Sequence, residues 1–164
     1  MELFFEEPSK NFQIREISRL TDIAVTSVKK YLEELLEEGL IRKSEKTLYP
    51  SYIADESNKM FVVYKQQRII YKIYLSGILD YLEEKTLPKC IVLFGSAAKG
   101  NYYKDSDIDL FIQSSERILE LKSFEKKLGH KIHIIFESEL KNLSKELFNN
   151  ILNGIVLYGF VKWR

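Results

Sequence analysis

Two aspartates in the C-terminal half of the chain, Asp107 and Asp109, stand two residues apart in the segment Asp-Ile-Asp-Leu. On a β-strand, residues i and i+2 point to the same face, so the two carboxylates project together while Ile108 and Leu110 enter the core. Aligned carboxylates repel each other unless a cation lies between them. Mg²⁺, or Mn²⁺ in its place, is the expected occupant, because such ions take oxygen ligands from one or two carboxylates and from substrate phosphates.

A turn suited to phosphate precedes the two aspartates. Gly95 and Ser96 follow the apolar run Cys90–Phe94 and open a short predicted helix. Glycine allows a backbone to approach a ligand closely, serine offers a hydroxyl and a backbone N–H, and a helix start favours an anion. The turn and the carboxylates together predict a metal-assisted site for a nucleoside triphosphate.

The residues between the turn and the aspartates allow two interpretations. Lys99 could contact a phosphate, and Tyr102 or Tyr103 could stack on a base. The simpler interpretation is an exposed loop with aromatic anchors. Lys99 is kept as a candidate phosphate contact.

The spacing resembles the signature of the polymerase-beta-like nucleotidyltransferases, and among them the minimal nucleotidyltransferases: Gly-Ser, ten residues, Asp-x-Asp. Gly95-Ser96, residues 97–106 and Asp107-Ile108-Asp109 match it without a gap. The resemblance implies that the glycine and serine bind the β- and γ-phosphates and that the aspartates hold Mg²⁺ against the α-phosphate. The implied reaction transfers a nucleoside monophosphate from an NTP, expected to be ATP, to a hydroxyl of a protein or nucleic acid and releases pyrophosphate. The alternative is an ordinary turn beside a solvated strand edge.

One position departs from the pattern of that family, which usually adds a third carboxylate on the strand after the next helix. Here that strand is predicted at Lys131–Phe136, and His133 occupies the expected position. Imidazole is a poor ligand for Mg²⁺, which puts a two-metal site in doubt. His133 could instead act as a general base, or have no catalytic part. Glu137 or Glu139 could supply the carboxylate, but both lie beyond the strand.

The N-terminal segment predicts a winged helix. Apolar residues at helical spacing indicate one helix that begins near Phe12, a turn at Thr21–Ala24 and a longer helix that ends at Gly39. A short hairpin follows, with Leu40 and Ile41 outgoing, a charged tip from Arg42 to Lys46, and Leu48 and Tyr49 returning before Pro50. The whole chain resembles prokaryotic proteins that fuse a winged helix to a nucleotidyltransferase domain.

The expected DNA contacts of such a module lie at the start of its second helix and on the wing. The candidates are Thr26, Ser27, Lys29, Lys30, Arg42 and Lys43, with Lys46 also on the wing. Acidic residues outnumber basic ones in this segment, so contact with DNA would be local and salt-sensitive. A protein-docking or dimerising role is the alternative.

The remaining pattern completes an α+β fold in three parts, with a winged helix-turn-helix at 1–50, a helical connector at 51–86 and a nucleotidyltransferase domain at 87–164. The connector is predicted to be helical from Ser57 to Lys85, interrupted only at Gly77, and its apolar surface must pack on the following domain or on a second copy of the chain. We therefore expect a homodimer. The last part is predicted to be a small mixed sheet flanked by helices, with strands at Cys90–Phe94, Ile108–Ile112 and Lys131–Phe136, helices at Glu116–Leu128 and Leu140–Leu152, and a last strand within Gly154–Val161.

Composition sets the remaining expectations. The 164 residues include 25 Lys and Arg against 24 Asp and Glu, so the chain has no global basic field for coating a polyanion. A single cysteine, Cys90, and the lack of a signal-like or membrane-length apolar segment favour the cytoplasm. The family's minimal members often act beside HEPN-domain toxins, which makes such a toxin a candidate acceptor. The competing function is a DNA-binding transcriptional regulator whose nucleotidyltransferase fold senses nucleotide or has lost turnover.

Overall fold

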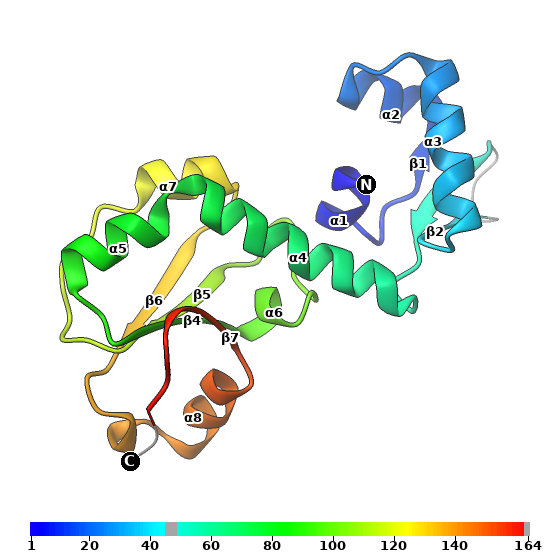
Figure 1. Ribbon diagram of the computed structural model, residues 1–164. Coiled ribbons are helices and arrows are strands. Elements are labelled where there is room, and N and C mark those ends of the chain that lie inside the picture. Colours follow the sequence, from blue (N-terminus) through cyan, green and yellow to red (C-terminus); the bar gives the residue numbers. More distant parts are fainter. Residues whose placement is uncertain (45–48, 163–164) are drawn as a thin grey trace. The chain divides into compact units, whose positions relative to one another are not determined.

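The computed structural model describes residues 1–44 and 49–162, and the chain divides into two compact units, Met1–Tyr64 and Lys65–Arg164. Figure 1 labels most of their helices and strands. Each unit has its own hydrophobic core and is described here by itself.

The first unit combines three helices with a small antiparallel sheet of order β1-β3-β2. Its elements are α1 (Glu2–Glu6), β1 (Phe12–Gln13), α2 (Ile14–Thr21), α3 (Val25–Glu37), β2 (Ile41–Ser44) and β3 (Ser51–Ala54). The order of helix, longer helix and hairpin is the one that the sequence predicts. Two elements were not predicted, α1 and β1, and they pack together through the edge-to-face rings of Phe4 and Phe12, whose centroids are 5.3 Å apart.

The hairpin of the first unit differs from its prediction at the returning strand. That strand is Ser51–Ala54, after Pro50, whereas the sequence suggested Leu48 and Tyr49. Ser44 pairs with Ser51, so the strand starts only where proline no longer removes a backbone donor. Tyr49 is 65% exposed, and Lys46 and Leu48 lie outside the described residues.

Packing of α2 against α3 forms the centre of the first core. Ile17, Val28 and Leu32 are buried there, whereas Leu20, expected on the same stripe, is 55% exposed. A capping box between Gln13 and Glu16 starts α2. No side chain caps α3 at Ala24, so its start depends on tertiary packing.

The boundary between the units falls within α4 (Lys59–Ser76), which is followed by α5 (Ile78–Thr86). Gly77 separates the two helices with a left-handed φ of +78°, and the Ser76 hydroxyl accepts a hydrogen bond from the N–H of Ile78. Ile69, Ile73 and Leu82 are completely buried in the core of the second unit. The connector therefore packs on the second unit from Ile69 onward.

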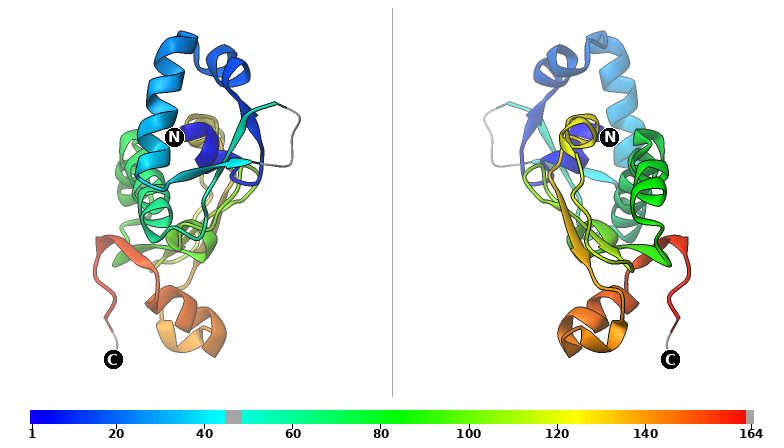
Figure 2. Two further views of the ribbon diagram at one scale, coloured as in Figure 1. Left: turned by 90° about the vertical axis from the view of Figure 1, so that its right-hand side faces the viewer. Right: turned by 90° about the vertical axis from the view of Figure 1, so that its left-hand side faces the viewer.

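A four-stranded mixed sheet of order β6-β5-β4-β7 forms the second unit. The strands are β4 (Cys90–Phe94), β5 (Ile108–Ile112), β6 (Ile132–Phe136) and β7 (Ile155–Gly159), where β5 and β6 are parallel and the other pairs antiparallel. Figures 1 and 2 show α4, α5 and α7 (Lys122–Leu128) on one face and α8 (Lys145–Leu152) on the other. Strand residues alternate between the two faces, so Ile91 and Leu93 pack in the cluster beneath α4, α5 and α7, while Val92 and Phe94 pack in the cluster beneath α8.

Two helices of the second unit are shorter than predicted. Residues 116–121 precede α7 without regular structure, because Leu119 and Leu121 pack on the core two residues apart and the N–H of Glu120 donates to the Tyr81 hydroxyl at 2.9 Å. The second predicted helix, Leu140–Leu152, is a 3₁₀ turn at Leu140–Asn142 followed by α8. The Ser144 hydroxyl accepts from the N–H of Leu147 and caps a new helix there.

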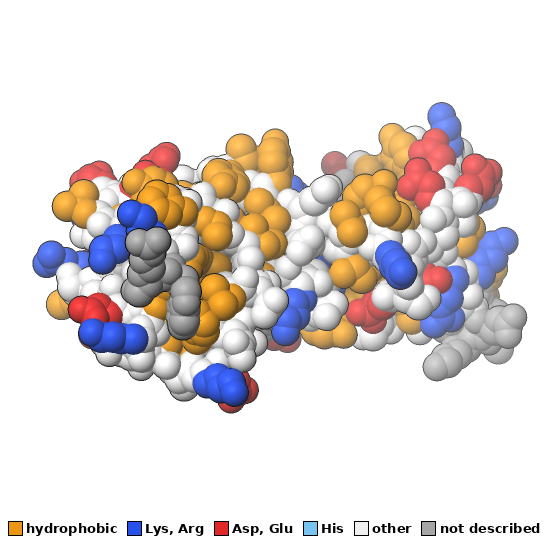
Figure 3. All heavy atoms as spheres, turned by 60° about the horizontal axis from the view of Figure 1, so that its bottom comes forward, with side chains coloured by type: hydrophobic (Ala, Val, Ile, Leu, Met, Phe, Trp, Pro, Cys, Tyr) orange, Lys and Arg blue, Asp and Glu red, His pale blue; other side chains and the backbone are white. Residues whose placement is uncertain are grey.

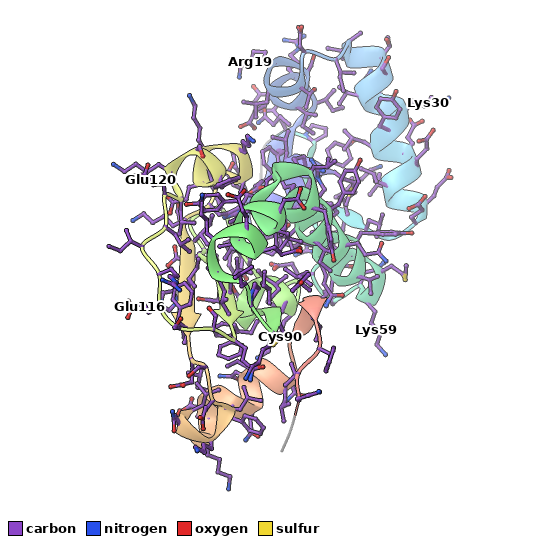
Figure 4. All side chains as sticks on the ribbon, turned by 60° about the vertical axis from the view of Figure 1, so that its left-hand side comes forward. Arg19, Lys30, Lys59, Cys90, Glu116 and Glu120 are labelled. Carbon is purple, nitrogen blue, oxygen red and sulfur yellow. The ribbon has the colours of Figure 1, made fainter. Side chains whose placement is uncertain are left out.

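Cys90 is a buried core residue, as the sequence suggests. Figure 4 shows it among the elements of the second unit, with Glu116 and Glu120 on the outside. Burial raises the pKa of its thiol, which disfavours the reactive thiolate. Within residues 1–44 and 49–162, no helix has the length and apolar character needed to cross a membrane.

Candidate active site

The predicted site residues come from three neighbouring strands at one edge of the second sheet. Phe94, the last residue of β4, pairs with Asp109 on β5, and Asp109 pairs with His133 on β6. Gly95 follows Phe94 directly, so the strand register alone brings Gly95, Asp109 and His133 together.

The turn at Gly95 lies directly against the Asp109 carboxylate. Gly95 has a φ of +72°, and a Cβ added there would overlap Oδ2 of Asp109 and lie 3.2 Å from its Cγ. Only glycine provides both the left-handed backbone and the space for the carboxylate. The glycine of the motif is therefore required by the acid of the motif, fourteen residues later in the chain.

Ser96 follows in α6 (Gly95–Ala98) and is half-buried. Its carbonyl accepts hydrogen bonds from the N–H groups of Lys99 and Asn101, which closes the turn. Its hydroxyl has no hydrogen-bond partner within 1–44 and 49–162, so it is available to a ligand. Because α6 is a single turn, its dipole is small, and the hydroxyl and backbone N–H groups are the main donors for an anion.

The two aspartates have different surroundings. The side chain of Asp109 is 25% exposed, between Gly95 and His133, whereas Asp107 is exposed and directly precedes β5. Asp107 has no ion pair or hydrogen bond with any other described side chain. Ile108 and Leu110 are buried as the alternation predicts, and the N–H of Ile108 donates to the carbonyl of Lys131 at 2.8 Å.

His133 contacts Asp109 through Nδ1, which lies 3.0 Å from Oδ1. An ionised carboxylate only accepts hydrogen bonds, so Nδ1 carries the proton. In neutral imidazole this leaves Nε2 as a proton acceptor. The side chain of His133 is 57% exposed, so a ligand has access to it.

Neither Glu137 nor Glu139 replaces the missing carboxylate. Both lie past the far end of β6, and Glu137 is roughly 13 Å along the strand from His133 at about 3.3 Å per residue. The N–H of Glu139 donates to the Glu137 carboxylate and, with smaller help from the side chain of Asn142, lowers the pKa of Glu137. Glu139 pairs with Lys141.

The two tyrosines in the loop between α6 and β5 differ in how far they are exposed. Tyr102 is 2% exposed and belongs to the core, so it cannot stack on a base, whereas Tyr103 is 48% exposed. Lys99 is exposed and forms no ion pair with the described residues. Sequence reasoning missed His130, whose Nδ1 lies 2.9 Å from the carbonyl oxygen of Ser106. A histidine just before a predicted strand is its only sequence signal.

The acids of this edge fit a divalent cation only together with a phosphate ligand. Nowhere in the described chain do three His, Cys, Asp or Glu side chains gather as a metal site. Mg²⁺ is commonly held by one or two carboxylates plus substrate phosphates, which the pair Asp107 and Asp109 with the turn at Gly95 can provide. The fit is to a metal and triphosphate bound together.

The candidate DNA contacts occupy the first unit. Thr26, Lys29 and Lys30 are exposed on the first half of α3 and Ser27 is half-buried, while Arg42 and Lys43 are exposed on β2. Figure 4 shows Lys30 on the outside of its helix. Glu34, at 4.0 Å, pairs weakly with Lys30. On the face shown in Figure 3, acidic and basic side chains are interspersed over both units, so that face carries no continuous basic surface.

Comparison of the sequence with models of known protein families finds one match. Residues 76–160, just over half of the chain, match the family described as polymerase beta, nucleotidyltransferase. The match includes α5, the whole four-stranded sheet and every residue of the candidate active site. Neither the curated proteins nor the solved structures include a significant match to this chain.

Proposed function

Because the chain belongs to the polymerase beta nucleotidyltransferase family, we propose that its second unit transfers a nucleoside monophosphate from an NTP to a hydroxyl group and releases pyrophosphate. ATP is the first nucleotide to test, and Mg²⁺ or Mn²⁺ the metal. The observation that supports this assignment is the close approach of Gly95 to the Asp109 carboxylate, since the turn proposed to bind phosphate lies beside an acid proposed to bind the cation.

The residues at the sheet edge divide the chemistry among them. The Ser96 hydroxyl and the backbone N–H groups of the turn hold the β- and γ-phosphates, with Lys99 within the same segment. Asp107 and Asp109 would hold the divalent ion, whose positive charge would supply charge neutralisation at the α-phosphate. The acceptor oxygen forms a bond to the α-phosphorus as the bond to the β-phosphate oxygen breaks. Nε2 of His133 takes the acceptor proton, while Asp109 orients the ring through Nδ1–H.

Incubation with labelled ATP and Mg²⁺ or Mn²⁺ tests this function. Wild-type chain is expected to incorporate label into an acceptor hydroxyl, or to form pyrophosphate, only when the metal is present. The double variant Asp107→Ala plus Asp109→Ala is expected to lose this reaction. Nucleotide binding without any incorporation, over a panel of NTPs and acceptors, would instead support a sensor.

Substitution of His133 by aspartate is a separate prediction. If His133 is the base, His133→Asp should lower the metal-dependent rate at least about tenfold. A rate that rises about tenfold would mean instead that only the third carboxylate limits turnover and that His133 is not the base. His133→Asn is the matched control, because it removes the imidazole without adding a charge. A lower rate in both variants, measured at saturating metal, would support the histidine as the base, whereas an unchanged rate in both would contradict that role.

The acceptor and the assembly belong to the same proposal. A HEPN-domain toxin offers a hydroxyl of the required kind, and a homodimer would cover the apolar residues that α4 leaves exposed in the second unit. Tyr71, Tyr74 and Leu75 are more than half exposed there. We also propose a cytoplasmic location, which the single cysteine, buried and unpaired in a disulfide, supports.

A second candidate function, a DNA-binding regulator that senses nucleotide, is favoured by the exposed Lys29 and Lys30 at the start of α3. In a winged helix this part of the second helix enters the major groove. Changing both lysines to alanine is expected to weaken binding to duplex DNA and to reduce its salt dependence by about two phosphate contacts. Affinity that does not change would favour protein docking by this unit.

A further inference from the structure

A histidine that the proposed reaction does not use, His130, lies just before β6 and packs against the loop that carries Asp107. His130 is 5% exposed, and its Nδ1 lies 2.9 Å from the carbonyl oxygen of Ser106. A carbonyl oxygen only accepts, so Nδ1 of His130 is protonated and donates. This carbonyl belongs to the planar peptide that joins Ser106 to Asp107, so the bond fixes the orientation of the backbone from which Asp107 projects.

The ring of His130 is itself held in place from α4. It packs edge to face against Tyr102, with ring centroids 5.5 Å apart and planes at 87°. The Tyr102 hydroxyl donates to the carbonyl oxygen of Lys65 at 3.2 Å, and Nζ of Lys65 lies 4.8 Å from the centre of the Tyr102 ring. Tyr102 and Lys65 are almost completely buried, so the imidazole has little freedom to turn.

Backbone bonds complete the fixation on either side of Asp107. The N–H of Ser106 donates to the carbonyl of Tyr103 at 2.9 Å, and the Ser106 hydroxyl accepts from the N–H of Tyr103 at 2.8 Å. After Asp107, the N–H of Ile108 is bound to Lys131. Asp107 is thus an exposed acid between two anchored peptides, and the anchor before it includes one side-chain donor from outside the loop, His130.

We propose that His130 is a positioning residue for Asp107: its Nδ1–H holds the Ser106 carbonyl so that the Asp107 carboxylate meets the divalent cation beside Asp109. The consequence for metal binding rests on the proposed function, whereas the tether itself does not. Outer partners of metal-binding groups typically contribute 10- to 100-fold to metal affinity or activity.

Two substitutions of His130 distinguish the effect of losing the hydrogen-bond donor from the effect of losing the ring. His130→Asn keeps an N–H donor at nearly the position of Nδ1 and loses the ring, whereas His130→Phe keeps a ring against Tyr102 and loses the donor. The phenylalanine variant is expected to bind Mn²⁺ in the presence of ATP about tenfold more weakly than wild type. The asparagine variant is expected to stay within about threefold of wild type, although it has lost more buried surface.

Two measurements test the proposal. Hydrogen exchange of the amides at residues 104–108 reports the tether without metal or nucleotide, and it should accelerate in His130→Phe but not in His130→Asn. Mn²⁺ titration followed by electron paramagnetic resonance reports the consequence for the acids. Unchanged exchange in the phenylalanine variant, or equal Mn²⁺ affinity in the two variants, overturns the proposal. If wild type binds no Mn²⁺ with ATP, the proposed function fails and the positioning role fails with it, while the exchange result separately shows whether the tether exists.

Discussion

Replacement of Asp109 by asparagine is expected to lower metal-dependent nucleotide transfer by about a thousandfold or more, because it removes a charge worth several kcal/mol toward the cation. Asparagine has the shape of aspartate, so its contact with Gly95 is preserved and its Oδ1 still accepts from Nδ1–H of His133. The free energy of unfolding should change by less than about 1 kcal/mol, since the side chain is partly exposed. Labelled-nucleotide incorporation, Mn²⁺ titration and thermal unfolding measure the three quantities.

Asp105 provides a matched control for that substitution. It is an exposed aspartate four residues earlier, outside the strand, and it pairs with no other described residue. Asp105→Asn removes the same charge and should leave transfer and Mn²⁺ affinity unchanged within about twofold. A similar loss in both variants would mean that general charge, and not coordination by Asp109, supports the reaction.

Gly95→Ala is expected to abolish transfer and also to destabilise the protein. The added Cβ would overlap the Asp109 carboxylate, and alanine at a φ of +72° costs about 1–2 kcal/mol by itself. Relief of the overlap requires Asp109 to move or the turn to open, which adds roughly 1–3 kcal/mol. Chemical denaturation and the transfer assay should therefore both show a large effect.

Gly129 isolates the backbone part of this cost. Its φ of +77° is nearly that of Gly95, but a Cβ there meets nothing within 4 Å. Gly129→Ala should cost only the left-handed strain and leave transfer intact. In a background of Asp109→Ala, the stability cost of Gly95→Ala should fall to the Gly129 value, because the overlapping atoms are gone. Equal costs with and without the Asp109 carboxylate would contradict the packing argument.

Two strands at the site, β4 and β5, could be predicted from local pattern with correct bounds, and β6 begins one residue later than predicted. Cys90–Phe94 is a continuous apolar run because α4, α5 and α7 cover one face of β4 and α8 covers the other. Ile108–Ile112 is likewise apolar at every position except Asp109. A strand that is buried on both faces is apolar at nearly every position, so it can be recognised in the sequence without knowing which strands it pairs with.

The errors lie where a distant contact decides the local conformation. Residues 116–121 carry apolar residues compatible with a helix, but the Tyr81 hydroxyl and the core hold them in an irregular path. The returning strand of the hairpin is Ser51–Ala54 and does not include Tyr49, because β3 pairs with both β1 and β2 from Ser51 onward. Tyr102 was assigned to an exposed loop because nothing nearby in the sequence shows that Lys65 and His130 surround it.

The sequence by itself determined the chemical inventory, namely Gly95, Ser96, Asp107, Asp109 and His133, and the strands that carry them, since side-chain type and alternation are local properties. Only the tertiary structure decided that Asp109 lies against Gly95 and bonds His133, that Glu137 and Glu139 are too far away, and that His130 holds the peptide before Asp107. Those relations depend on strand register and on packing between segments far apart in the chain, which cross-strand hydrogen bonds and the shared core impose and no local pattern encodes.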